Sequence, residues 1–142
     1  RIGVASKPEV GIGEVKLSGL GRRHGMTSGL KPTLKVMQWH HAEVQELPEG
    51  AEVLATSPIT KVQIMAVADT LLATQFHAEL TPALIERWAH IPQYIDWLNE
   101  ALGPDAYAIV RAKALPLMPQ LERMSRTLFN NLIEGKALRQ AA

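Results

Sequence analysis

The sequence predicts an α/β protein whose central sheet is shared with residues outside this 142-residue chain. Residues 1–80 hold short β-type runs punctuated by Gly and Pro, whereas residues 81–142 change to helical periodicity. The run Val62–Val67 is apolar on both faces, which is typical of a strand covered by helices on both sides. Because the predicted helices follow residue 80, a doubly wound sheet would need an upstream α/β half to supply the missing layer.

The strands predicted in the first part are short and separated by turn residues. Expected strands cover Ile12–Leu17, Leu34–Trp39 (running into His40 and His41) and Glu52–Thr56, with a loop over Gly19–Gly29 and a turn at Pro48–Gly50. Val62–Val67 and Leu71–Phe76 are apolar runs joined by residues 68–70. So short a link predicts an antiparallel hairpin.

The helices of the second part are delimited by Pro and Gly. Thr81 is a suitable N-cap for a helix with Pro82 at its first position. Pro92 breaks this helix, and a second helix with the apolar face Tyr94, Ile95, Leu98 and Leu102 is expected before Gly103 and Pro104 end it. A weaker helix is expected over Asp105–Ala114. From Pro119 onward an apolar stripe predicts a last helix, and it consists of Leu121, Met124, Leu128 and Leu132.

Composition limits the classes of function. Fifteen basic and fourteen acidic residues give a net charge of +1, so there is no electrostatic case for nucleic acid or an anionic membrane as partner. No apolar run approaches the roughly 20 residues of a membrane span. The chain contains no cysteine, which excludes internal disulfides and is compatible with a cytoplasmic location.

The end of the run Leu71–Phe76 carries the most suggestive chemistry. His77 and Glu79 follow it, and a strand that ends in His-x-Glu suits a base with the carboxylate that orients it. The nucleophile of such a triad would be cysteine or serine. No cysteine is present and no serine lies in a G-x-S-x-G setting, so any nucleophile must come from outside these residues.

The same residues admit two other interpretations. His77 and Glu79 could simply be a strand-end histidine and a solvated carboxylate. Together with His40 or His41, they could also supply a nitrogen-rich triad for zinc or iron. Adjacent histidines on a strand point to opposite faces, so only one of that pair could join His77. No helical H-x-x-x-H or H-E-x-x-H motif supports a metal site.

Four phrases in order give these residues a family context. They are P-E-V-G-I-G-E-V-K-L (Pro8–Leu17), M-Q-W-H-H-A-E-V (Met37–Val44), L-P-E-G-A-E-V-L-A-T-S-P (Leu47–Pro58) and Q-F-H-A-E-L-T (Gln75–Thr81). Together they resemble the C-terminal half of a class I glutamine amidotransferase domain, of the stand-alone kind similar to the amidotransferase part of GMP synthase. The resemblance covers about residues 1–90 and implies a flavodoxin-like α/β fold with a mixed sheet, a β-hairpin and C-terminal helices.

The resemblance also implies roles for individual residues. His77 and Glu79 would be the catalytic base and its orienting carboxylate, serving a cysteine on a strand-to-helix elbow in the first half of the domain. The segment Trp39, His40 and His41 would line the pocket for the α-amino and α-carboxyl groups of glutamine. The family usually has Pro between the His and the Glu, whereas this chain has Ala78. No metal and no cofactor is implied.

The expected function is therefore part of a glutamine amidotransferase, with glutamine as substrate, the upstream half as partner and an ammonia acceptor on another chain. Residues 1–90 are expected to form the C-terminal half of the amidotransferase domain, and residues 91–142 a helical extension packed on it. Because Arg1 is no initiator methionine, the chain is expected to be a fragment or a processed product, inactive alone. The alternative is a non-catalytic, amidotransferase-like binding or assembly module.

Overall fold

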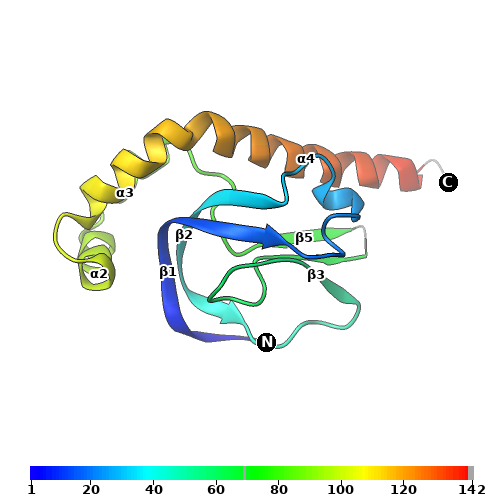
Figure 1. The fold of residues 1–142 in the computed structure, drawn as a ribbon, viewed down its shortest axis with the longest axis horizontal. Coiled ribbons are helices and arrows are strands. Elements are labelled where there is room, and N and C mark those ends of the chain that lie inside the picture. The colour runs from blue at the N-terminus through cyan, green and yellow to red at the C-terminus, as the bar shows by residue number, and fades with distance from the viewer. Residues whose placement is uncertain (69, 141–142) are drawn as a thin grey trace.

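The computed structural model describes residues 1–68 and 70–140, with side chains through residue 134. One five-stranded sheet has the strand order β2-β1-β3-β4-β5. Helices follow the last strand, and α3 and α4 form a long rod along the sheet (Figure 1). The elements are β1 (Ile2–Leu17), the 3-10 turn η1 (Gly25–Thr27), β2 (Thr33–Val44), β3 (Ala51–Thr56), β4 (Ile64–Val67), β5 (Leu71–Thr74), α1 (Pro82–Trp88), α2 (Pro92–Leu102), α3 (Ala106–Ala114), η2 (Leu115–Leu117) and α4 (Met118–Gln140).

β1 and β2 form a long curled hairpin that makes up one side of the sheet (Figure 1). Their register shifts between Val4 and Glu9, and Gly11 has a φ of 84°, a conformation that glycine adopts without a steric penalty. Both strands are longer than predicted. The start of β1 pairs with Ala42–Val44, so β2 continues past His40 and His41. Sequence alternation alone does not reveal this pairing, because Lys7 and Pro8 lie in the irregular stretch between the two paired parts of β1.

The predicted β4–β5 hairpin is confirmed. Ile64 pairs with Thr74 and Val67 with Leu71, antiparallel, and residue 69 of the link lies outside the described residues. β5 is one of the two edge strands of the sheet, and β2 is the other. Every strand pair among the described residues is antiparallel, so the parallel strands of a doubly wound sheet are not among them.

The helix boundaries match the sequence signals. The Thr81 hydroxyl accepts a hydrogen bond from the Leu84 N–H, and Pro82 opens α1. α2 begins at Pro92 and is ended by Gly103, whose φ is 90°. α4 starts one residue before the predicted Pro119. The α/β class with a β-hairpin followed by C-terminal helices is thus confirmed.

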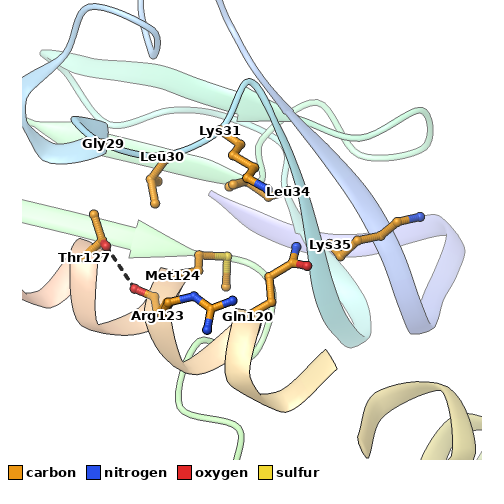
Figure 2. A pocket seen from close by; sticks show the side chains of 9 residues that line it. All are labelled: Gly29, Leu30, Lys31, Leu34, Lys35, Gln120, Arg123, Met124 and Thr127. Carbon is orange, nitrogen blue, oxygen red and sulfur yellow. Dashed lines mark hydrogen bonds between the residues drawn. The ribbon is translucent and has the colours of Figure 1, made fainter. Parts of the chain in front are cut away.

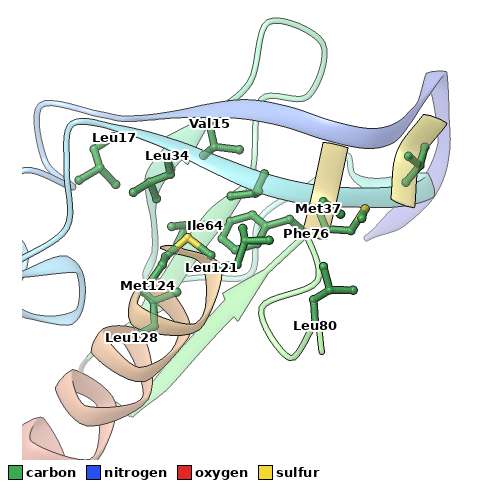
Figure 3. Packing of buried hydrophobic residues seen from close by; sticks show 14 of the residues in the cluster. Val15, Leu17, Leu34, Met37, Ile64, Phe76, Leu80, Leu121, Met124 and Leu128 are labelled. Carbon is green, nitrogen blue, oxygen red and sulfur yellow. The ribbon is translucent and has the colours of Figure 1, made fainter. Parts of the chain in front are cut away.

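Both parts of the chain contribute to one core. Strand residues such as Val36, Leu54 and Ile64 are fully buried, and they belong to the same cluster as Leu121 and Leu128 of α4. Figure 3 shows α4 directing its apolar stripe at the sheet and at Phe76, just before His77. The predicted stripe of α4 is therefore core. No helix among the described residues is long and apolar enough to cross a membrane.

Candidate active site

His77 lies shortly beyond the end of β5 and is tied to β2 through its main chain. The His77 N–H donates to the Met37 carbonyl oxygen at 2.9 Å, an isolated bridge between the two segments. The Nδ1 atom of His77 lies 2.6 Å from Oε1 of Glu79. The His77 side chain is 30% exposed and that of Glu79 is 63% exposed. The predicted hydrogen bond between these two side chains is confirmed.

This contact defines which nitrogen of His77 carries the proton. An ionised carboxylate only accepts hydrogen bonds, so Nδ1 donates to Glu79 and the neutral ring keeps Nε2 unprotonated. Nε2 can then accept a proton from a neighbouring acid. The dyad forms although Ala78 stands where the resembling family has proline.

Trp39 and His77 both pack against the indole of Trp88. The indole of Trp88 is 4.6 Å from that of Trp39 and 5.0 Å from the His77 imidazole, measured between ring centroids. Tyr94 and Trp97 of α2 cover Trp39 further, at 5.6 and 6.1 Å. We call Trp39, Trp88, Tyr94 and Trp97 the aromatic cluster. The rings of Trp39 and His77 are thus both within contact range of Trp88.

The two histidines after Trp39 have different environments. His40 is buried, with Nδ1 3.0 Å from the Ala42 carbonyl oxygen and Nε2 3.1 Å from Oε1 of Gln38. His41 is exposed and shares the strand face of Trp39 by alternation. All three residues lie inside β2, so the prediction of a strand end at this point is wrong. The structure brings Trp39 towards His77 and turns His40 to the other face.

Burial lowers the pKa of His40, because the charged ring is poorly solvated there, although Ala42 and the Glu9 carboxylate oppose this shift. The neutral ring donates from Nδ1 to Ala42 and accepts at Nε2. A 180° rotation of the Gln38 amide would then present its NH₂ group to Nε2. In the rotated amide, Gln38 Nε2 would donate to His40. In the unrotated amide, Gln38 Nε2 has no hydrogen-bond partner among the described residues.

A buried polar cluster around Glu9 was not predicted from the sequence. The Glu9 carboxylate is 8% exposed and accepts hydrogen bonds from Ser57 Oγ at 2.9 Å and Gln63 Nε2 at 2.7 Å. His40 Nε2 lies 3.6 Å from the same oxygen. The available signal was Gln63, a polar residue inside the apolar run Val62–Val67. This cluster ties β1, β2 and the segment leading into β4 together on the face opposite Trp39.

The residues considered as a metal triad are not gathered at one point. His40 contacts Gln38 and Ala42, whereas His77 contacts Glu79. Within residues 1–68 and 70–140, no group of three or more His, Asp or Glu side chains is placed to hold a metal ion. The alternative of a zinc or iron triad therefore has no gathered set of ligands among the described residues.

Two cavities flank α4. One, of about 250 Å³, lies beside the dyad and is lined by Leu72, Thr74, Ala78, Glu79, Ser125, Leu128, Phe129 and Leu132. The other, of about 270 Å³, lies between α4 and the segment before β2 (Figure 2). None of the predicted site residues lines this second cavity. Glu79 of the dyad borders the first cavity, whereas His77 is not among its lining residues.

The fold and the His–Glu dyad define a class of protein that comparison with known families makes explicit. The family model of the class I glutamine amidotransferases matches residues 4–87, more than half of the chain. The chain therefore belongs to the class I glutamine amidotransferase family.

Curated relatives in this family include the glutamine-hydrolysing GMP synthase subunit of Sulfolobus acidocaldarius. It is 36% identical over 77 residues, which are 54% of this chain and 39% of that protein. The corresponding subunit of Sulfurisphaera tokodaii is 35% identical over the same shares of the two chains. The chain thus matches well under half the length of these curated relatives.

Solved structures with the same fold include a glutamine amidotransferase from Thermotoga maritima, with a TM-score of 0.78 and 22% identity over 94% of this chain and 55% of that chain. A glutamine amidotransferase from Methylobacillus flagellatus gives a TM-score of 0.78 at 18% identity, over 95% of this chain and 55% of that chain. At these identities the likeness establishes the fold.

Proposed function

We propose that this chain supplies the general base, its orienting carboxylate and part of the glutamine pocket of a glutamine amidotransferase, with a cysteine nucleophile contributed by an upstream half. The observation that carries the proposal is the 2.6 Å contact between His77 Nδ1 and Glu79 Oε1, which leaves Nε2 as the proton acceptor. Family membership supports the reaction class.

In the proposed reaction, the cysteine sulfur attacks the side-chain amide carbon of glutamine while His77 Nε2 takes the thiol proton. His77 returns that proton to the leaving nitrogen, so the C–N bond breaks and ammonia leaves a γ-glutamyl thioester. Water then attacks the thioester, and His77 moves the proton from water to the sulfur. Glutamate and free thiol result, and no cofactor takes part.

The substrate would lie beside the aromatic cluster. The segment Trp39, His40 and His41 would bind the α-amino and α-carboxyl groups of glutamine, largely through backbone atoms. Trp39 would wall the pocket and exclude water from the thioester. Because the His40 side chain turns to the buried face, its contribution would be through the backbone, whereas His41 is exposed on the Trp39 face.

The upstream half would dock beside β5. This strand is one of the two edges of the sheet, so its outer N–H and C=O groups can pair with a further strand. The cavity between β5 and α4 is bordered by Glu79 and by Phe129, which is 63% exposed. Residues 1–90 would complete the amidotransferase domain with that half, and residues 91–142 would form the helical extension packed on it.

The ammonia acceptor would be a separate protein. The curated relatives are named as one subunit of GMP synthase, which implies a partner subunit for those proteins. We extend this arrangement to the present chain, with glutamine hydrolysis here and ammonia use elsewhere. We also propose the cytoplasm as its location, in line with the absence of cysteine from these 142 residues.

The test compares glutamate release from glutamine by the 142-residue chain and by the parent protein that includes the upstream half. The chain alone should be inactive, and the parent should be active. His77→Ala in the parent should reduce turnover by about 10²–10⁴-fold, the usual contribution of a general base, while His90→Ala, at an exposed histidine outside the proposed site, should leave kcat nearly unchanged. Turnover by the chain alone, or an active His77→Ala parent, would contradict the proposal.

The second candidate is a non-catalytic binding or assembly module of the amidotransferase family. It is favoured by one observation, the absence of cysteine from these residues. A parent protein without a cysteine elbow upstream, inactive on glutamine but stably bound to a partner enzyme, would establish it.

A further inference from the structure

The His77 imidazole is held on two sides by very different groups. On one side Nδ1 meets Glu79, a side chain that is 63% exposed. A contact to so exposed a carboxylate is weak and does not hold a ring rigidly by itself. On the other side lies the indole of Trp88, 5.0 Å away with the ring planes at 63°, an edge-to-face arrangement.

Trp88 is far more constrained than Glu79. It is 6% exposed and is the last residue of α1, a helix fixed at its start by the Thr81 cap and on its inner face by Ile85, which is 1% exposed. Its indole packs on that of Trp39 at 4.6 Å. Trp88 is therefore a rigid surface against which the His77 ring can rest.

The aromatic cluster extends this support to α2. Tyr94 and Trp97 also pack on Trp39, so an unbroken line of rings runs from α2 through Trp39 and Trp88 to His77. All three tryptophans of the chain lie in this line. Core packing alone does not explain the arrangement, because Tyr94 is 39% exposed and adjoins the proposed substrate segment.

We propose that Trp88 is a positioning residue for His77: its indole restricts rotation of the imidazole, so that Nδ1 stays on Glu79 and Nε2 stays aimed at the reacting proton. This inference rests on the proposed function of His77 as base. Proton transfer depends steeply on angle and distance, and a misplacement of about 1 Å can cost about 100-fold in rate. A ring held only by Glu79 would populate unproductive orientations.

The direct test measures the His77 imidazole by long-range ¹H–¹⁵N NMR in the 142-residue chain. The wild type should show the Nδ1–H tautomer with one well-defined ring signal. Trp88→Ala and Trp88→Leu should give averaged tautomers or a broadened signal, and Trp88→Phe should largely restore the wild-type pattern. Trp97→Ala is the matched control, since it also removes one indole that packs on Trp39 but has no ring contact with His77.

A wild-type His77 signal in folded Trp88→Leu, or equal changes in Trp88→Leu and Trp97→Ala, would overturn the proposal. Folding is checked by the melting curve. Trp88→Leu is the variant of choice because it keeps an apolar side chain in the core, whereas Trp88→Ala leaves a larger cavity.

The parent protein supplies the kinetic test. Trp88→Leu should lower kcat by about 10–100-fold with KM nearly unchanged, and Trp88→Phe should recover most of it. A rise in KM with unchanged kcat would place Trp88 in substrate binding and overturn the positioning role. If His77→Ala leaves turnover unchanged, the proposed function fails instead, and the NMR comparison still decides whether Trp88 orients the ring.

Discussion

Leu128→Ala tests whether the helical part of the chain and the sheet unfold as one unit. Leu128 is 4% exposed and lies on the inner face of α4, in the same core cluster as the strand residues (Figure 3). Its neighbour Phe129 is 63% exposed on the same helix. The two positions thus provide a buried site and an exposed control one residue apart.

The magnitude follows from burial and from the space around the side chain. Leucine-to-alanine changes in cores cost about 2.7–5.0 kcal/mol. Leu128 borders the cavity beside Glu79, so part of its surface is not closely packed, and the cost should lie near the lower end, at about 3 kcal/mol. With a urea m-value of about 2 kcal/mol per molar, the unfolding midpoint should fall by about 1.5 M.

The assay follows urea unfolding with two probes. Far-UV circular dichroism reports the helices, whereas tryptophan fluorescence reports the aromatic cluster, in which Trp39 of β2 packs against Trp88. Leu128→Ala should shift both transitions together, and Phe129→Ala should change stability by no more than about 0.5 kcal/mol. A shift in the dichroism curve with an unchanged fluorescence curve would refute a single cooperative unit.

Three further predictions concern local features. Because burial lowers the pKa of His40, the unfolded chain binds more protons than the folded chain as the pH falls through about 6.5, and the free energy of unfolding should fall with it. In chemical denaturation at several pH values, His40→Gln should flatten this pH dependence, and His41→Gln should not. Gly21→Ala should destabilise strongly, since a Cβ there would collide with the Leu54 backbone, whereas Gly19→Ala meets open space; equal melting temperatures would contradict this. Thr81→Ala should cost about 1 kcal/mol through loss of the α1 cap, with Thr81→Ser nearly neutral in the same measurement.

Local sequence signals predict much of the fold. Pro82, Pro92 and Gly103 mark helix boundaries because proline lacks an N–H and glycine tolerates a positive φ, and both effects act within a turn. The β4–β5 hairpin followed from the short link between two apolar runs. The His77–Glu79 hydrogen bond was likewise predictable, since the two residues are near neighbours in the chain.

The features that escaped prediction depend on pairing between distant residues. The extension of β2 through His41 needs the start of β1 as its partner, which alternation in β2 does not reveal. The Glu9 cluster joins residues far apart in the chain, and no local pattern marks a buried carboxylate. Trp88 lies in the helix that Thr81 and Pro82 predict, but its contact with His77 arises only because α1 folds back onto β2.

The central claim is that His77 activates a cysteine carried by the upstream half. The most direct measurement is covalent labelling of the parent protein by an electrophilic glutamine analogue, followed by intact mass. The account predicts one adduct on an upstream cysteine, formed at least about 100-fold more slowly in His77→Ala and only moderately more slowly in Glu79→Ala. Labelling at an undiminished rate in His77→Ala, or no labelling of any cysteine in the folded parent protein, would contradict it.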